Sequence, residues 1–101
     1  MTALLQGENA TIYGAGGGIG AGVARTFARE GARVFLAGRA RETLDAVATD
    51  ITSESGAAEV AVLDALDEAA VDEHVREVGN QAGSVDVSFN LISRGAPRWS
   101  R

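Results

Sequence analysis

The stretch from residue 14 to residue 20, Gly-Ala-Gly-Gly-Gly-Ile-Gly, is the part of the sequence that most clearly suggests chemistry. Backbone without side chains lets a phosphate group approach closely, and the N-terminus of a following helix supplies unpaired N–H groups with a partial positive charge. The spacing of Gly14, Gly18 and Gly20 fits the pattern G-x-x-x-G-x-G, and a P-loop is excluded because the chain has no lysine. The segment therefore predicts a nucleotide-binding loop.

Few other side chains could take part in a reaction. All nine cationic residues are arginines, cysteine is absent, and Tyr13 and His74 are the only tyrosine and the only histidine. These counts exclude lysine-dependent and thiolate chemistry and leave multi-histidine metal sites unsupported. We predict no catalytic residue and no metal site within this chain, and we interpret His74 as a solvated residue on a polar helix face.

The elements that must position the glycines alternate along the chain. Continuous apolar runs predict buried strands over residues 9–13, 33–37, 59–63 and 85–92. Apolar residues at helical spacing predict three helices, which cover about residues 18–30, the region between Arg39 and Ser53, and a stretch with Asp67 as its N-cap. A helix between each pair of successive strands implies parallel pairing with right-handed connections.

The 101 residues are enough for one small domain. We predict this domain over residues 1–93 and an irregular basic tail over residues 94–101. The tail holds three of the nine arginines with the only proline and the only tryptophan, and it contains no acidic residue. The domain boundary therefore follows a change in composition.

The glycine loop and three later segments resemble the short-chain dehydrogenase/reductase family. Residues 14–20 look like the cofactor motif of that family, and the similarity continues through R-V-F-L-A-G-R, V-L-D-A and D-V-S-F-N, over about residues 7–93. The resemblance implies an α/β, Rossmann-like parallel sheet of four strands in the order 3-2-1-4 with three crossover helices, an incomplete doubly wound fold. It also implies an oxidoreductase that moves hydride between NAD or NADP and an alcohol or carbonyl.

The resemblance, read with the spacing, assigns cofactor-binding roles to ten residues. Arg39 stands at the end of the second predicted strand, where an arginine accommodates the 2′-phosphate of NADP and an acid would bind the ribose of NAD. We therefore expect NADP to be preferred, with NAD possible, while Arg41 either assists or is solvated. Asp64 matches the aspartate that binds the adenine, or it caps the following helix. The predicted set is Gly14, Gly16, Gly17, Gly18, Ile19, Gly20, Arg39, Asp64, Ala65 and Asn90.

The resemblance also implies a catalytic serine and a Y-x-x-x-K pair. Tyr13 adjoins the glycine loop and the chain has no lysine, so the pair is absent from these 101 residues. We expect NADP binding without catalysis from this chain alone. The alternatives are a non-catalytic NADP-binding or docking module and an inert truncated fragment. The fourth strand would have an open apolar edge, which predicts self-association.

Charge and hydropathy restrict the other partners. The net charge of −5 and the isoelectric point near 4.7 argue against binding to a nucleic-acid backbone, which needs a basic face. The first residues lack the pattern of a signal peptide, and no apolar run reaches the ~18 residues of a membrane span. We expect a cytoplasmic protein with no nucleic-acid or membrane partner.

Overall fold

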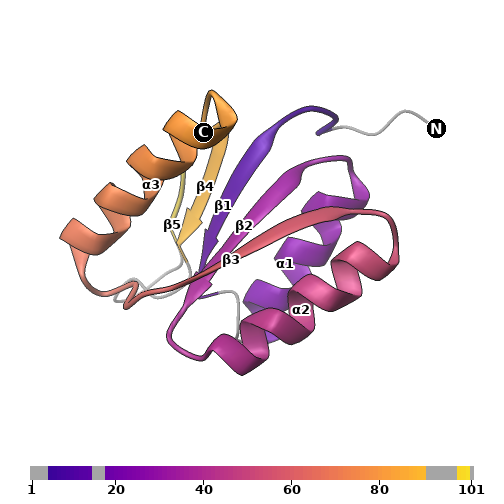
Figure 1. Ribbon diagram of the computed structural model, residues 1–101, viewed down its shortest axis with the longest axis horizontal. Coiled ribbons are helices and arrows are strands. Elements are labelled where there is room, and N and C mark those ends of the chain that lie inside the picture. The colour runs from indigo at the N-terminus through magenta and orange to yellow at the C-terminus, as the bar shows by residue number, and fades with distance from the viewer. Residues whose placement is uncertain (1–4, 15–17, 91–97, 101) are drawn as a thin grey trace.

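The computed structural model describes residues 5–14, 18–90 and 98–100, which form one sheet with helices on both of its faces (Figure 1). The strands are β1 (Asn9–Tyr13), β2 (Arg33–Gly38), β3 (Ala57–Val62), β4 (Val87–Asn90) and β5 (Arg98–Ser100). The helices are α1 (Gly18–Arg29), α2 (Arg41–Ser53) and α3 (Glu68–Ala82). The sheet order is β3-β2-β1-β4-β5, and the first four strands are parallel. The predicted parallel sheet in the order 3-2-1-4 with three helices is confirmed.

The short strand β5 corrects two predictions about the end of the chain. Residues 94–101 are not irregular throughout, because Arg98–Ser100 pair with β4 in antiparallel register, from Ser88↔Ser100 to Asn90↔Arg98. The predicted open edge of β4 is covered along the same three pairs. An outer strand offers unpaired N–H and C=O groups that an extended segment can satisfy. A segment of three residues is too short to show a strand period in the sequence.

The larger core lies between the sheet and the helices α1 and α2, which share one face (Figure 1). Ile12 from β1, Leu36 from β2 and Leu44 from α2 are fully buried in it. Alternate residues of the same strands point to the other face, which α3 covers. Burial from both sides explains the continuous apolar runs of β1 and β2.

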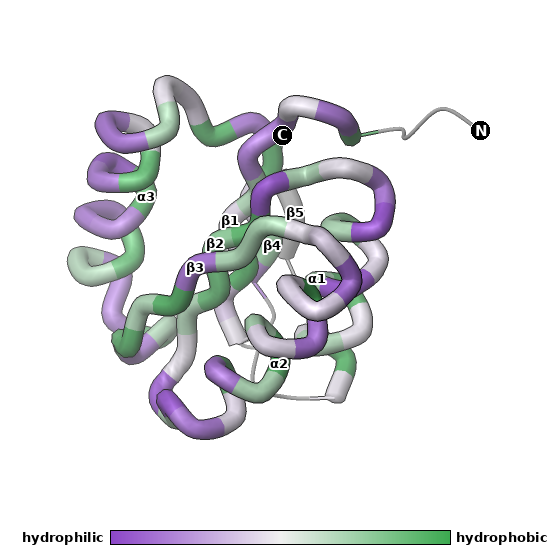
Figure 2. Tube along the Cα trace, turned by 45° about the vertical axis from the view of Figure 1, so that its right-hand side comes forward, coloured by the Kyte–Doolittle hydropathy of each residue, from purple (hydrophilic) through white to green (hydrophobic). Residues whose placement is uncertain are grey.

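A smaller core lies beneath α3 and contains Tyr13, Ala37 and Ala65. Figure 2 shows the apolar side of α3 turned toward the sheet and its polar side turned away. Asp67 caps this helix as predicted, since its side chain accepts a hydrogen bond from the Ala70 N–H at 3.2 Å. The three predicted crossover helices thus divide between the two faces, two against one.

Candidate functional site

The carboxyl ends of the four parallel strands meet at one edge of the sheet. Tyr13, the last residue of β1, is in register with Ala37 in β2 and with Asn90 in β4. The chain leaves β1 toward α1 on one face, whereas α3 lies on the opposite face. Ligands of open α/β sheets bind outside the strand ends at such a change of direction. The edge around Tyr13 is therefore the candidate site.

The glycine loop begins at Gly14, which adopts a left-handed conformation with φ of 85°. Residues with side chains rarely adopt this conformation, and the Gly14 N–H donates to the Ala37 carbonyl at 2.8 Å. The loop ends where α1 starts at Gly18, with no acidic residue in the first helical turn. Gly18 and Ile19 are exposed, whereas Gly20 is buried. The predictions for Gly16 and Gly17 lie outside the described residues.

Arg39 lies directly after β2, on an exposed turn before α2. Among the described residues it forms no ion pair, whereas the Arg41 guanidinium lies 3.8 Å from the Asp45 carboxylate, Nη1 to Oδ1. Ala37 and Gly38, where an acid would stand in an NAD site, are buried and uncharged. Arg39 is thus available to a bound anion, while Arg41 is already engaged on its own helix.

Asp64 forms a turn after β3 and does not cap α3. Its Oδ1 accepts a hydrogen bond from the Leu66 N–H at 2.9 Å, and Asp67 holds the helix cap instead. The carboxylate of Asp64 is exposed near the edge. Ala65 is 8% exposed and packs with Tyr13 in the smaller core, so its methyl group points into the protein. The side chain of Asp64 is therefore exposed near the edge, whereas that of Ala65 is buried in the smaller core.

The structure also shows a buried pair that the sequence interpretation missed. His74 is 8% exposed, and its Nδ1 lies 2.9 Å from the Tyr13 hydroxyl, with the two rings edge to face. The prediction that His74 is solvated is wrong. It follows Val71 by three residues and precedes Val78 by four, so it belongs to the apolar stripe of α3. That spacing was the signal for its burial.

Burial shifts the acid–base behaviour of both partners. Burial raises the pKa of Tyr13 to about 12, an effect that the nearby Asp72 carboxylate reinforces and a contact with Thr11 opposes. Burial also lowers the pKa of His74, and the Glu77 carboxylate opposes this shift in part. At neutral pH the pair is therefore uncharged, and the tautomer of His74 decides whether the phenol donates to Nδ1 or Nδ1–H donates to the phenol oxygen.

Comparison with known proteins identifies the family. Residues 8–93 match the model of the short chain dehydrogenase family. The chain belongs to the short-chain dehydrogenase/reductase family. Gluconate 5-dehydrogenase of Gluconobacter oxydans is 38% identical over 95 residues, which are 92% of this chain and 37% of that protein. Meso-2,3-butanediol dehydrogenase of Serratia marcescens is 40% identical over 79 residues, which are 78% of this chain and 31% of that protein.

Solved structures of the family have the same arrangement of elements. A metagenomic short-chain oxidoreductase in complex with NADP superposes with a TM-score of 0.78 and 37% identity, covering 83% of this chain and 38% of that one. A dehydrogenase/reductase from Sinorhizobium meliloti gives a TM-score of 0.81 at 33% identity, covering 88% and 36%. The chain spans about a third of the length of the curated relatives it matches. The matched part is the NAD(P)-binding region of this oxidoreductase family.

The described ranges contain neither a metal-ligand cluster nor a membrane-spanning helix. Residues 5–14, 18–90 and 98–100 contain no group of three or more His, Cys, Asp or Glu side chains that could hold a metal ion. No helix in the same ranges is long and apolar enough to cross a membrane.

Proposed function

We propose that this chain binds NADP(H) at the carboxyl edge of its sheet, as the cofactor-binding part of a short-chain dehydrogenase/reductase. The residues there fit a dinucleotide: the left-handed turn at Gly14 starts a loop without bulky side chains, and the start of α1 at Gly18 offers unpaired backbone N–H groups to a pyrophosphate. The exposed Asp64 carboxylate stands where an adenine amino group could donate to it. Asn90 ends β4 in register with Tyr13, on the nicotinamide side implied by the family.

The exposed position of Arg39 is the observation that supports a preference for NADP over NAD. Its guanidinium is exposed beside the strand edge and, among the described residues, has no carboxylate partner. A guanidinium pairs well with the 2′-phosphate that distinguishes NADP from NAD, since it can donate two parallel hydrogen bonds. The buried, uncharged Ala37 and Gly38 offer no acceptor to the ribose hydroxyls of NAD. NADP therefore gains a charged contact that NAD lacks.

The bound nicotinamide would supply or accept a hydride at the carbon of an alcohol or carbonyl. The chain would bind and orient the cofactor, but its sequence lacks the tyrosine–lysine pair that the family resemblance implies for that reaction. Tyr13 is fully buried with its hydroxyl engaged by His74, and the chain has no lysine. This burial favours the second candidate function, a binding module that does not catalyse hydride transfer on its own. We expect no turnover of generic ketones or alcohols by this chain.

Titration of the purified chain with NADPH and NADH tests the proposal. We expect NADPH to bind more tightly, and we expect Arg39→Ala to weaken NADPH binding about 10-fold or more, since charged hydrogen bonds contribute ~1.5–3 kcal/mol. NADH binding should change little. Arg41→Ala is the matched control, because Arg41 is also exposed but lies within 3.8 Å of the Asp45 carboxylate. Tighter binding of NADH, or an equal loss in both variants, would refute the role of Arg39.

The predictions about cellular location and about other partners rest on the sequence and not on the geometry of the candidate site. A cytoplasmic location and the absence of nucleic-acid and membrane partners stay predictions from charge and hydropathy. Self-association also stays a prediction, although the edge on which it was based is covered at Ser88–Asn90 by β5. Sedimentation of the chain over a range of concentrations measures it directly.

A further inference from the structure

We propose that His74 is a positioning residue of the cofactor site: neutral His74 holds Tyr13, and through it the start of the glycine loop, so that protonation of His74 weakens cofactor binding. The inference rests on the proposed cofactor function. It concerns a side chain on α3, on the opposite face of the sheet from α1, for which the cofactor site itself gives no role.

His74 is connected to the loop by a hydrogen bond to Tyr13 and by the peptide bond from Tyr13 to Gly14. Its Nδ1 and the Tyr13 hydroxyl are 2.9 Å apart, and Tyr13 is fully buried. The next residue is Gly14, whose N–H donates to the Ala37 carbonyl and whose left-handed turn starts the loop. A shift of the Tyr13 ring would therefore act on the backbone from which the loop departs.

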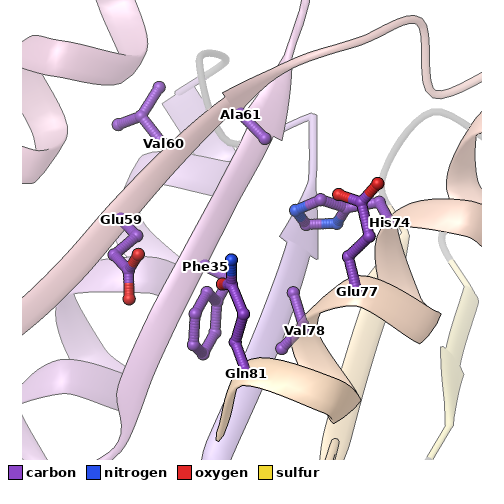
Figure 3. A pocket seen from close by; sticks show the side chains of 8 residues that line it. All are labelled: Phe35, Glu59, Val60, Ala61, His74, Glu77, Val78 and Gln81. Carbon is purple, nitrogen blue, oxygen red and sulfur yellow. The ribbon is translucent and has the colours of Figure 1, made fainter.

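Protons reach the pair through a pocket of about 200 Å³ between α3 and the strands β2 and β3. Figure 3 shows His74 and Glu77 on the α3 side of this pocket and Glu59 on the β3 side. The ionisable group of β1 that faces His74 is Tyr13 itself. Around the pair, Glu59 from β3 and Glu77 from α3 line the pocket, and the Asp72 carboxylate of α3 acts on Tyr13. Phe35 is the contribution of β2 and carries no charge. Arg33 neutralises Glu59 through an ion pair.

Protonation changes the pair in two ways. In the neutral tautomer that carries its proton on Nε2, Nδ1 accepts the phenolic hydrogen, and because Nδ1 becomes a donor in the imidazolium, protonation reverses that hydrogen bond. A positive charge also enters the smaller core, where burial opposes it more than Glu77 supports it. Both changes favour a displacement of helix α3 away from Tyr13. The Tyr13 ring then loses the contact that fixes its position under the loop.

A competing effect has the opposite sign, which makes the inference testable. A positive His74 near the loop would attract the phosphates of the cofactor and strengthen binding as the pH falls. If positioning dominates, the part of the affinity that depends on His74 is constant above pH 6.5, the ordinary pKa of histidine, and it decreases as the pH falls through the lowered pKa of His74. Losing one buried hydrogen bond predicts a decrease of about fivefold, and one proton limits the slope to a factor of ten per pH unit.

The experiment is calorimetric titration of the chain with NADP⁺ between pH 5 and pH 8, next to the same titration of His74→Gln. The glutamine amide oxygen can accept from Tyr13 but does not titrate. Both proteins share the protonation of the cofactor's own 2′-phosphate, whose pKa is near 6 for a phosphate monoester. The difference between the two pH profiles therefore reports His74 alone. As the pH falls, we expect the affinity of the unaltered chain for NADP⁺ to show the additional fivefold decrease, and we expect His74→Gln not to show it.

A second measurement does not depend on any variant folding. His74 is the only histidine, so its ring protons are identified in an NMR spectrum without assignment. If cofactor binding favours neutral His74, saturating NADP⁺ must lower its pKa further. An unchanged or raised pKa, or tighter binding at pH 5 than at pH 8, would overturn the inference. Absence of NADP⁺ binding at pH 8 would refute the proposed function and the inference together, whereas binding independent of pH refutes the inference alone.

Discussion

Alkaline pH acts on a single side chain of this protein. The chain has no lysine and no cysteine, and Tyr13 is its only tyrosine. Between about pH 9 and pH 12, tyrosine is thus the one side chain whose charge changes substantially. Burial raises the pKa of Tyr13 from 10.0 to about 12, and the ring is fully buried beneath α3. We therefore predict that stability falls over this interval for one identifiable reason.

The sign and size follow from the two pKa values. The unfolded chain releases the phenolic proton near pH 10.0, whereas the folded chain retains it until about pH 12. The stabilisation is fully present below pH 10.0 and is lost as the pH rises to about 12. Two pH units at ~1.36 kcal/mol each amount to about 2.7 kcal/mol. For a domain of this size the loss lowers Tm by roughly 10–20 °C.

Two assays measure the prediction independently. The ultraviolet absorbance of tyrosinate gives the pKa of Tyr13 in the folded chain, and thermal unfolding followed by circular dichroism gives Tm at each pH. Tyr13→Phe is the control, because it removes the titrating group and keeps the ring. We expect the variant to show little decrease in Tm between pH 9 and pH 12. A tyrosinate midpoint near pH 10 before unfolding, or the same alkaline loss in the variant, would refute the reasoning.

Two further predictions concern the turns that hold the elements in place. Asp67→Ala removes the N-cap bond to Ala70 and should lower the free energy of unfolding by about 1 kcal/mol, measured by urea denaturation. Gly31→Ala should cost more than Gly83→Ala, although both positions have positive φ. A methyl group at Gly31 would lie 2.9 Å from the Gln6 Cα, whereas one at Gly83 meets nothing within 4 Å. Gly83→Ala isolates the backbone strain of roughly 1–2 kcal/mol, and equal losses in the two variants would contradict the steric explanation.

The parallel sheet could be predicted because its strands are buried on both faces. Val34 and Leu36 point toward α1 and α2, while Phe35 points toward α3, so β2 reads as one apolar run. The boundaries of β3 were less accurate, since this outer strand mixes small and charged residues and begins at Ala57, two residues before the predicted start. The strand Arg98–Ser100 had no periodic signal at all.

The sequence also predicted some features of the candidate site and not others. Glycines and Arg39 could be placed at the strand edge from sequence, because the order of strand, turn and helix fixes where each turn lies. The position of Ala65 within the core could not, since a single alanine after a strand carries no periodicity. The Tyr13–His74 contact also escaped prediction, because it joins residues 61 positions apart that only the packing of α3 brings together. Helical spacing indicated the burial of His74, but the sequence carries no mark of the polar partner that the buried side chain meets.

The central position of β1 affects the order in which the sheet can assemble. Its pairing with β2 connects neighbouring parts of the chain, whereas Thr11 meets its β4 partner Ser88 across 77 positions. Closing so long a loop is slow, so the half of the sheet with β1, β2 and β3 has the contacts to form first. Until β4 docks, β1 has one unpaired side. That interval during folding, rather than the finished sheet, is when this chain is most exposed to association with another copy.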